Sequence, residues 1–536
     1  MRLPLDALAD QAFVARTLIS AGIVSPGRPD RVARAVLALG KWGKTHAAGY
    51  AAAAARTPDR VAIVDERGTL TFAEVDARTT RLSNALRERG VSAGDSVALM
   101  CRNHRGFIEA TVALNKVGAH VLYLNTSFAA PQIADVVKRE GARALVYDAE
   151  FAGLVGEAAR RRKRFISWHE PDEEPAEETL ERLVSEGSPD EPGAPADTSR
   201  TVILTSGTTG TPKGANRGTP DSLAPAAALL QRIPLRARET TMIAAPLFHS
   251  WGFAHWTLGT ALGSTIVLRH RFDPEGTLAA VAEHRASALA VVPVMLQRIM
   301  DLAPERRAAY DTSCLRVIAA SGSALPGPLA IKVMDTFGDV LYNLYGSTEV
   351  AWATIAGPED LRAAPGTAGT PPRGTVMRLL DPEGREVPRG ETGRIFVANE
   401  MQFEGYTGGG GKEILGGLMS TGDVGHLDAA GRLFVDGRDD DMIVSGGENV
   451  FPAEVEDLLH AHDAIREAAV VGVPDDEFGQ RLKAVVVLRE GAALDADEVR
   501  AHVKANLARF KVPREVEFVS ELPRNATGKV LRRELG

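Results

Sequence analysis

The sequence predicts an α/β protein in which several β-sheets are flanked by helices, followed by a small α+β module. Helix-like and strand-like segments alternate between Tyr50 and Ala119, a pattern typical of α/β architectures. With 44% hydrophobic and 25% charged residues, the 536-residue chain can bury a large core, which excludes a disordered or fibrous protein. At about 150 residues per domain, the length alone predicts three or four modules.

The elements of the first part follow from hydrophobic periodicity and turn residues. An acidic, proline-containing stretch, Glu170–Asp197, predicts a surface loop, and the five bases Arg160–Arg164 before it predict a solvated segment paired with its own counter-charges. The other expected elements are a helix around Tyr50–Arg56, a strand at Ala62–Asp65, a Thr-Leu-Thr-Phe turn, a long helix at Phe72–Arg89, a strand at Ser96–Leu99 and a buried strand at Thr201–Thr205.

The last 97 residues, 440 to 536, predict a separate compact α+β module. Its expected elements are a helix at Ala453–His460, strands at Glu467–Val473 and Ala484–Leu488, a helix at Ala496–Leu507 and a strand at Val516–Val519. We therefore divide the chain into a helical arm (1–44), a large domain (45–439) and this module.

The first 44 residues carry seven basic and three acidic residues, with apolar positions at roughly helical spacing. Two interpretations remain open. The arm packs as a helix on the main body, or its basic amphipathic surface makes a weak peripheral contact with a membrane.

The net charge and the cysteine content limit the classes of partner and the cellular compartment that we expect. The formal net charge of −8 does not suggest a nucleic-acid partner. Only two cysteines occur, Cys101 and Cys314, so we expect no disulfide framework. We find no signal-peptide pattern and no apolar run of about 18 residues, and we expect a cytoplasmic protein.

A glycine- and hydroxyl-rich segment directly follows the strand Thr201–Leu204. Small residues let the backbone approach an anion, hydroxyls add donors, and Lys213 adds a cation, so the segment predicts a phosphate-binding loop. It is not a Walker A loop, because Pro212 stands where that pattern requires glycine. The loop residues are Thr205, Ser206, Gly207, Thr208, Thr209, Gly210, Thr211, Pro212, Lys213 and Gly214.

This segment resembles the signature loop of the adenylate-forming superfamily, which includes the acyl-CoA synthetases, and four further motifs follow in the family's order. The resemblance covers roughly residues 45 to 536. The four motifs are Tyr345-Gly346-Ser347-Thr348-Glu349, Ser420-Thr421-Gly422-Asp423, Gly437-Arg438-Asp439-Asp440 with Gly446-Gly447-Glu448, and Pro523-Arg524-Asn525-Ala526-Thr527-Gly528-Lys529.

The resemblance implies an enzyme that joins a carboxylate to the α-phosphate of ATP and then transfers the acyl group to coenzyme A. Glu349 matches the family's Mg²⁺-holding carboxylate, and Asp423 and Arg438 match the pair that binds the ribose hydroxyls. Lys529 is the expected cation against the reacting oxygens. Ser321, Gly322 and Ser323 resemble the adenine- and acyl-contacting segment. The resemblance also implies catalytic roles for Thr205 and His249 beside Glu349 and Lys529.

The family runs its two half-reactions by rotating a mobile C-terminal lid about a hinge, and Asp440 matches the hinge position. In the second orientation, the loop containing Gly446 and Gly447 would border the pantetheine tunnel. The resemblance therefore implies domain alternation as well as a two-step reaction.

The acyl pocket is expected at Ala245–Gly252, a segment similar to the family's pocket segment. His249 follows Phe248 where amino-acid-activating members usually have aspartate, which argues against an amino-acid substrate. Trp251, Phe253 and Gly322 are expected at an apolar acyl site, although Trp251, Phe253 and Trp256 could equally be core. No third ligand lies near His249 and His255, so we exclude a metal pair there.

Two local features depart from what a motif search would suggest. Gly90–Gly94 fits the G-x-S-x-G pattern of serine hydrolases, but a helix enters it and a strand leaves it, so we interpret it as a connecting turn. Arg394 stands where the family commonly has glutamate, and Gly408–Gly411 replaces part of the usual segment before Asp423. Both departures affect the expected strength of nucleotide binding.

We therefore expect an ATP-dependent acyl-CoA ligase, acting on a fatty or other bulky apolar acid, with ATP, Mg²⁺ and coenzyme A as partners. The alternatives are a ligase that loads a separate carrier protein, a variant that mainly forms thioester from a supplied acyl-adenylate, and an idle binding module. No carrier domain follows Lys529 in the sequence, which favours free coenzyme A. A homodimer is compatible with the sequence.

Overall fold

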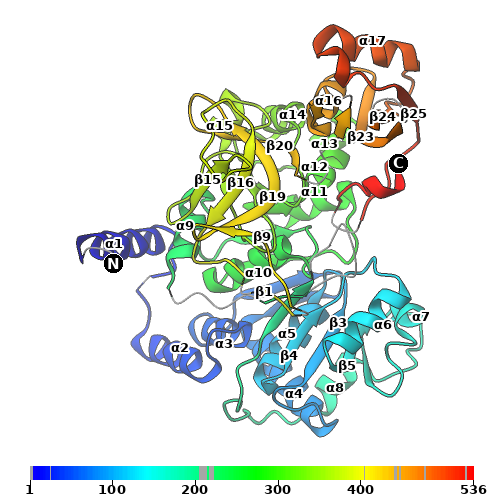
Figure 1. Cartoon of the computed structure of the whole chain (residues 1–536). Coiled ribbons are helices and arrows are strands. Elements are labelled where there is room, and N and C mark those ends of the chain that lie inside the picture. The colour runs from blue at the N-terminus through cyan, green and yellow to red at the C-terminus, as the bar shows by residue number, and fades with distance from the viewer. Residues whose placement is uncertain are drawn as a thin grey trace. The chain divides into compact units, whose positions relative to one another are not determined.

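The computed structural model (Figure 1) describes residues 4–24, 26–204, 214–216, 222–403, 405–407, 409–439, 443–445, 448–475, 479–525 and 528–536. The chain forms two compact units. Unit 1 comprises Met1–Val291, Asp301–Ala319 and Met401–Gly411, and unit 2 comprises Val292–Met300, Ala320–Glu400 and Lys412–Gly536. The predicted fold class, α/β with several sheets, is confirmed. The domain boundaries expected at residues 44 and 439 stay predictions.

The first sheet of unit 1 has seven strands in the order β17-β8-β7-β4-β3-β5-β6. The five strands from β7 to β6 run parallel, and β8 and β17 add an antiparallel edge. Their bounds are β3 Ser96–Met100, β4 His120–Tyr123, β5 Ala142–Asp148, β6 Lys163–Trp168, β7 Thr201–Leu204, β8 Gly214–Asn216 and β17 Gly405–Tyr406.

The second sheet of unit 1 places β2, β1, β10, β9, β11 and β12 side by side in that order. Its bounds are β1 Val61–Asp65, β2 Gly68–Thr71, β9 Thr240–Ile243, β10 Thr265–Val267, β11 Ala288–Val291 and β12 Val317–Ala320, of which residues up to Ala319 belong to this unit. The strands β1, β10, β9 and β11 pair in parallel.

The turn predicted at Thr69–Phe72 is wrong, because Gly68–Thr71 forms β2, which pairs antiparallel with β1. Gly68, at φ +100°, makes the tight turn that the sequence analysis placed later. The long helix then begins at Phe72 with a capping box, in which Thr71 and Glu74 each accept the other's backbone N–H. The hairpin and the helix therefore meet without an intervening loop.

Helices surround these sheets. Their bounds in unit 1 are α1 Pro4–Ser20, α2 Pro29–Trp42, α3 His46–Arg56, α4 Phe72–Glu88, α5 Arg105–Val117, α6 Ala130–Arg139, α7 Ala152–Val155, α8 Leu180–Glu186, α9 Ala224–Arg232, α10 Ser250–Leu262, α11 Pro274–Glu283 and α13 Pro304–Ala308, with a 3₁₀ turn at Ala149–Phe151. The G-x-S-x-G segment lies between α4 and β3, which confirms that it is a connecting turn.

The acidic stretch expected to be a surface loop contains the helix α8, so that prediction is partly wrong. Thr179 caps the helix by accepting the backbone N–H of Arg182, and Leu180, Leu183 and Val184 are buried. The helix packs against α4. Three apolar residues among many charges were enough to form a short buried face, which the charge pattern concealed.

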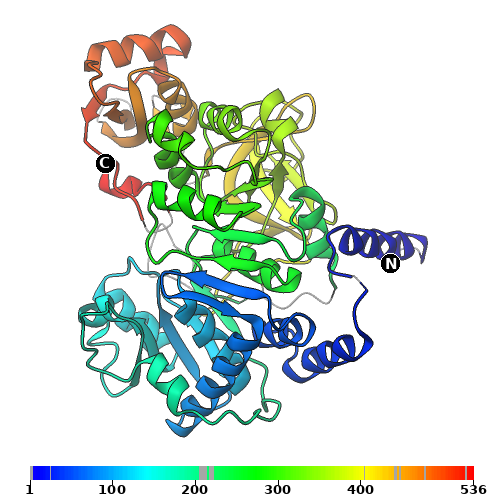
Figure 2. The ribbon, with the colours of Figure 1, turned by 180° about the vertical axis from the view of Figure 1, so that it is seen from behind.

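The N-terminal arm consists of two helices rather than one, and Figures 1 and 2 show α1 and α2 as separate blue rods. Helix α1 contacts α9 and helix α2 contacts α3. The interpretation that the arm packs on the main body is therefore confirmed for both helices. None of the described helices is long and apolar enough to cross a membrane.

One sheet of unit 2 is antiparallel, with the strand order β15-β16-β19-β18 and with β20 paired to β19. The strands β13 and β14, which pair antiparallel, also belong to this unit. The bounds are α12 Pro293–Met300, α14 Gly327–Phe337, β13 Leu341–Tyr345, β14 Thr354–Ala356, α15 Pro358–Ala363, β15 Val376–Leu380, β16 Gly393–Ala398, β18 Ile414–Leu415, β19 Leu418–Leu427 and β20 Leu433–Arg438.

The C-terminal part of unit 2 is the α+β module that the sequence predicts. Its sheet has the order β22-β21-β24-β23, with β25 parallel to β24. Residues of β23 alternate between two cores: Val470 faces α16 and α17, whereas Val471 packs with Leu522 and Leu535. The bounds are β21 Ile443–Ser445, β22 Glu448–Val450, α16 Pro452–His460, β23 Ile465–Asp475, β24 Gly479–Leu488, α17 Ala496–Asn506 and β25 Glu515–Phe518, with 3₁₀ turns at Arg509–Lys511 and Arg532–Glu534.

The core of unit 1 includes an uncharged histidine at the start of α3. His46 stacks on Trp256 with ring centroids 3.8 Å apart, and its Nε2 lies 3.0 Å from Thr257 Oγ1. Burial lowers the pKa of His46 to about 3. Protonation is therefore disfavoured in the folded protein but not in the unfolded chain.

We expect the free energy of unfolding to fall between pH 6.5 and pH 4, because over that range the unfolded chain binds the proton that folded His46 rejects. One such group contributes at most about 1.4 kcal/mol per pH unit. Urea titrations at a series of pH values should show a shallower slope for His46→Phe. The half-buried His284→Gln is the control, and an unchanged slope in His46→Phe would contradict the assignment.

Candidate active site

The predicted phosphate loop connects two paired strands of unit 1. Leu204 at the end of β7 pairs with Gly214 at the start of β8, and residues 205–213 connect the two strands in sequence. These nine residues lie outside the described part of the chain, and their phosphate-binding role stays a prediction. Gly214 itself is sterically required, because a Cβ atom there would lie 2.7 Å from Thr407 Oγ1 and from Val202 Cγ1.

The expected acyl-pocket segment leads into α10. His249 precedes the helix in extended conformation, and Trp251 is buried with its Nε1–H donating to the carbonyl of Val291 at 3.0 Å. Trp256 is fully buried and its Nε1–H donates to Tyr50 Oη at 3.0 Å. Trp256 is therefore a core residue rather than part of an acyl site. Phe253 is half-buried, with its ring 5.7 Å from that of Tyr123.

One face of α10 borders a small apolar cavity of about 10 Å³ in unit 1, which is room for roughly one water molecule. His255 is the polar residue of its lining: burial lowers its pKa to about 4, and its Nδ1 has no hydrogen-bond partner among the described residues. The sequence analysis did not include His255 or the α9 side in the pocket. The lining residues are Leu229, Leu230, Ile233, Leu235, Trp251, Ala254, His255 and Leu258.

In unit 2, the predicted adenine-contacting segment follows β12 directly. Ser321 is buried, and Gly322 adopts φ +99°, a conformation that favours glycine. A Cβ atom at Gly322 would lie 3.4 Å from Val292 Cγ1. The backbone of this segment is therefore held close to the start of α12, with little room for a larger residue.

The predicted Mg²⁺-holding residue lies in a tight turn after β13. Gly346 allows the turn, because a Cβ atom there would lie 2.2 Å from the carbonyl oxygen of Ala351. Ser347 Oγ accepts the backbone N–H groups of Glu349 and Val350 at 3.2 and 3.3 Å. These contacts fix Glu349, which is 8% exposed. A buried carboxylate oxygen is the donor type that Mg²⁺ prefers, so the residue fits the role the family implies.

The predicted ribose-binding pair lies on adjacent strands. Asp423 of β19 is in register with Arg438 of β20, and Arg438 Nε lies 3.5 Å from Asp423 Oδ1. Tyr345 Oη donates to Asp423 Oδ2 at 2.6 Å. Burial raises the pKa of Asp423, while Arg438, Tyr345, Lys529 and Lys412 oppose the increase. Burial and the carboxylate of Asp423 raise the pKa of Tyr345 well above its ordinary value, so the phenol stays a donor.

Lys529 follows a short hairpin at the C-terminus. Asn525 and Lys529 exchange hydrogen bonds at 2.9 Å, and Gly528 at φ +82° makes the turn. Lys529 as a residue is exposed. Loss of solvation lowers the pKa of Lys529 and the charge of Arg438 adds to this effect, whereas Asp423 and Glu349 counteract it.

Unit 2 thus brings five predicted site residues within electrostatic range of one another: Tyr345, Glu349, Asp423, Arg438 and Lys529. The sequence analysis missed Lys412, whose charge also stabilises the Asp423 carboxylate. Its position at the end of the glycine run was the available signal, but no spacing rule connected it to Asp423. The carboxylates and cations alternate, an arrangement able to hold a polar, multiply charged ligand.

The charge reversal at Arg394 has local partners. Arg394 Nε lies 2.9 Å from Asp439 Oδ2, and its Nη2 also pairs with Glu413. Asp439 is the last described residue before Asp440, the predicted hinge, which together with Gly446 and Gly447 lies outside the described residues. A glutamate at position 394 would instead face two carboxylates, so Arg394, Glu413 and Asp439 form one compensated set.

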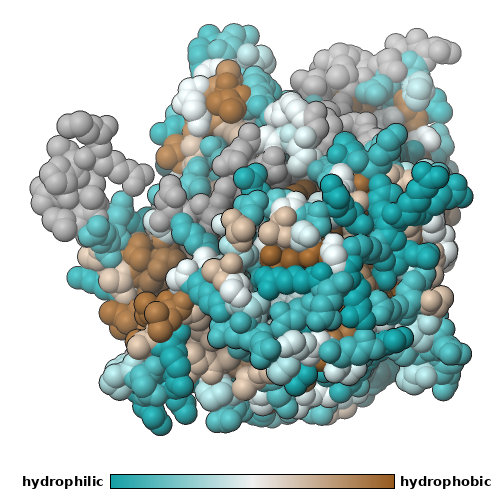
Figure 3. All heavy atoms as spheres, turned by 90° about the horizontal axis from the view of Figure 1, so that it is seen from below, coloured by the Kyte–Doolittle hydropathy of each residue, from teal (hydrophilic) through white to brown (hydrophobic). Residues whose placement is uncertain are grey.

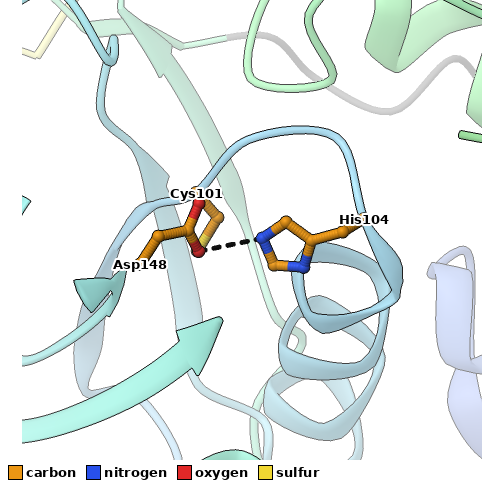
Figure 4. Close-up of side chains that lie close together, drawn as sticks. All are labelled: Cys101, His104 and Asp148. Atoms are coloured by element: carbon orange, nitrogen blue, oxygen red, sulfur yellow. Dashed lines mark hydrogen bonds and ion pairs between the residues drawn. The ribbon is translucent and has the colours of Figure 1, made fainter. Parts of the chain in front are cut away.

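A second group of potential metal ligands lies in unit 1, where Cys101, His104 and Asp148 meet (Figure 4). His104 caps α5 because its Nδ1 accepts the N–H of Gly106 at 3.0 Å, so its Nε2 carries the proton and donates to Asp148 at 2.8 Å. A metal would need the lone pair at that nitrogen. Ser167 also donates to Asp148, at 2.6 Å. We interpret the group as a hydrogen-bonded network that joins β3, α5, β5 and β6.

Comparison with known proteins assigns the family. Residues 50–407 match the AMP-binding enzyme family, and residues 454–529 match the AMP-binding enzyme C-terminal domain. Feruloyl-CoA synthase of an Amycolatopsis species is 35% identical over 487 residues, covering 90% of this chain and 96% of that protein. The 2-succinylbenzoate–CoA ligase of a Geobacillus species is 32% identical, covering 89% and 94%. The solved o-succinylbenzoate CoA synthetase of Bacillus subtilis, in complex with its acyl-adenylate, superposes with a TM-score of 0.79 at 28% identity, covering 91% and 97%.

The chain belongs to the AMP-binding enzyme family. It is an acid–thiol ligase that forms an acyl-adenylate and then an acyl-CoA, and its cofactors are ATP, Mg²⁺ and coenzyme A. The idle binding module is therefore excluded. The roles of individual site residues stay predictions.

We expect Lys529→Ala to reduce acid-dependent release of pyrophosphate by about 10²–10³-fold, because its ammonium interacts with Asp423 and Glu349 and would stabilise charge on the reacting oxygens. Thioester formation from supplied acyl-adenylate should be much less affected. Lys504→Ala, on the exposed face of α17, is the matched control. An undiminished rate in Lys529→Ala would remove Lys529 from the first half-reaction.

Proposed function

We propose that the protein is an ATP-dependent CoA ligase for an aromatic or other bulky, largely apolar carboxylic acid. The observation that carries the substrate class is the segment that leads into α10, where His249 stands in place of an aspartate and Phe248 and Trp251 are buried. A site without that carboxylate favours a neutral, hydrophobic acyl group over an amino acid, whose ammonium group would be buried without a counter-charge. The names of two relatives, feruloyl-CoA synthase and 2-succinylbenzoate–CoA ligase, support the same class.

In the first half-reaction a carboxylate oxygen attacks the α-phosphorus of ATP, a P–O bond forms, and pyrophosphate leaves. We assign Lys529 to stabilise the charge that develops on the reacting oxygens. Glu349 would hold Mg²⁺, which neutralises phosphate charge when bound. Thr205–Lys213 would bind the outer phosphates, with Thr205 and His249 at the reacting carboxylate.

The nucleotide sugar is assigned to Asp423 and Arg438. A half-buried carboxylate whose pKa is raised gains from additional donors, and two ribose hydroxyls supply them. Tyr345 holds the carboxylate in place through its 2.6 Å hydrogen bond. In the second half-reaction the sulfur of coenzyme A attacks the acyl carbon, the acyl–phosphate bond breaks, and AMP leaves. We assign Gly446 and Gly447 to the path of the thiol and Asp440 to the hinge.

A panel of acids incubated with ATP and coenzyme A and analysed by mass spectrometry tests the proposed class. We expect thioesters of cinnamic, phenylalkanoic and similar acids, and little product from amino acids. Acid-dependent exchange of pyrophosphate into ATP measures the first step separately. Exchange without CoA thioester would favour the carrier-protein ligase, and thioester from supplied acyl-adenylate without exchange would favour a second-step variant.

We expect Ala254→Phe to change substrate selectivity, because the new ring is too large for the cavity of about 10 Å³ beside His255 and would displace neighbouring side chains of α10. The kcat/KM for a bulky aryl acid should fall by about 10–100-fold, while that for a short acid such as propanoate should change little. Ala261→Phe, at an exposed position of the same helix, is the control. An equal loss for both acids would show that the cavity does not select the acyl group.

A further inference from the structure

Large apolar side chains are exposed at an unusual density in the N-terminal segment. Eleven large hydrophobic residues are exposed in the described part of the chain, and six of them fall between residues 19 and 39. Most natural proteins expose such residues singly, so a concentration of this kind marks an interaction surface. We call these six the N-terminal apolar face: Ile19, Val24, Val32, Val36, Leu37 and Leu39.

Helix α2 presents most of this face to solvent. At 100° per residue, Val32, Val36 and Leu39 lie within about 60° of one another, and Leu37 lies about 100° from Val36. Ala35 and Trp42, which are buried, continue the same apolar side next to Leu39. Val36 is 61% exposed and Leu37 is 70% exposed, so one edge of the apolar side is buried and its other edge faces solvent. Figure 3 shows hydrophobic side chains gathered at the left of the view, the side on which α1 and α2 lie in Figure 1.

The orientation of α2 is fixed by contacts on its inner side. Trp42 is 4% exposed, with the ammonium groups of Lys41 and Lys116 lying 4.6 and 5.9 Å from its ring centroid. Arg31 donates to the backbone carbonyl of Arg56 at 3.1 Å. The helix cannot simply roll over to bury its apolar side without breaking these contacts.

Positive charge borders the apolar face. Residues 26–45 include five basic residues and one acidic residue, in a chain whose net charge is −8. Arg28 and Arg34 are 70% and 61% exposed, and both pair with Asp30, at 3.2 and 3.0 Å. Two arginines against one aspartate leave an excess positive charge at the edge of the face.

We propose that the N-terminal apolar face docks on an anionic lipid membrane. Apolar side chains would enter the boundary between headgroups and acyl chains, and the bordering arginines would pair with lipid phosphates. The charge favours this occupant over a second copy of the chain, because two copies meeting through this face would bring their arginine-rich borders together. The proposal does not depend on the substrate of the ligase.

Co-sedimentation of the full-length protein with vesicles tests the proposal. Vesicles of 70% phosphatidylcholine and 30% phosphatidylglycerol should bind at least ten-fold more protein than vesicles of phosphatidylcholine alone, and the binding should weaken with salt. Val36→Asp/Leu37→Asp should reduce binding at least ten-fold. Arg28→Glu/Arg34→Glu should reduce binding and make it less salt-dependent.

Val376→Asp is the matched control, because Val376 is also an exposed valine but belongs to unit 2. All variants should retain ligase activity on a water-soluble acid and an unchanged circular dichroism spectrum, which separates loss of docking from misfolding. Unchanged vesicle binding in Val36→Asp/Leu37→Asp would overturn the proposal. A dimer seen by light scattering and abolished by the same substitution would also overturn it, in favour of a second copy.

Discussion

The half-buried carboxylate of Asp423 is stabilised by groups drawn from four separate segments of unit 2. Tyr345 ends β13, Arg438 ends β20, Lys412 precedes β18, and Lys529 follows the C-terminal hairpin. Burying a carboxylate costs several kcal/mol unless charges and donors compensate for it. The pKa of Asp423 is nevertheless raised, so its compensation is incomplete. A ligand that brings hydroxyl donors would complete it, which couples the arrangement of these segments to nucleotide binding.

The same balance explains how a net acidic protein can bind ATP and coenzyme A. Its cations near Asp423 are placed singly and each faces a carboxylate, so the site is not a general basic patch. Arg394 follows this rule as well. It replaces an expected glutamate, and its two partners, Glu413 and Asp439, are carboxylates that a glutamate would repel. The charge reversal at Arg394 is therefore compensated by the two carboxylates that it contacts.

Local periodicity was sufficient to predict most of the fold, because each element carries its own signal. The helices α4, α16 and α17 begin or end within a residue or so of their expected bounds, since capping residues and apolar spacing are local. Predictions failed where tertiary packing decided the outcome. The strand β2 exists because β1 lies beside it, and α8 exists because α4 covers three apolar residues.

The candidate site shows the same division. Motifs identified Glu349, Asp423, Arg438 and Lys529, but they could not connect Lys412 with Asp423 or His255 with the leucines of α9. These are contacts between segments distant in sequence, and a single sequence by itself carries no record of such contacts. Trp251 and Trp256 illustrate the limit: both lie on α10 five residues apart, yet one borders a cavity and the other is core.

Helix α2 follows only in part the rule by which amphipathic helices are usually placed. A surface helix normally gains its stability by burying its apolar side, whereas α2 buries Trp42 and Ala35 and leaves the neighbouring valines and leucines exposed. Exposing each of these side chains to water costs free energy. Arg31 and Lys41 add polar contacts that hold the inner side of the helix on the protein. Because the inner contacts of Trp42, Arg31 and Lys41 do not use the exposed valines and leucines, docking of those residues would require no rearrangement of the fold beneath them.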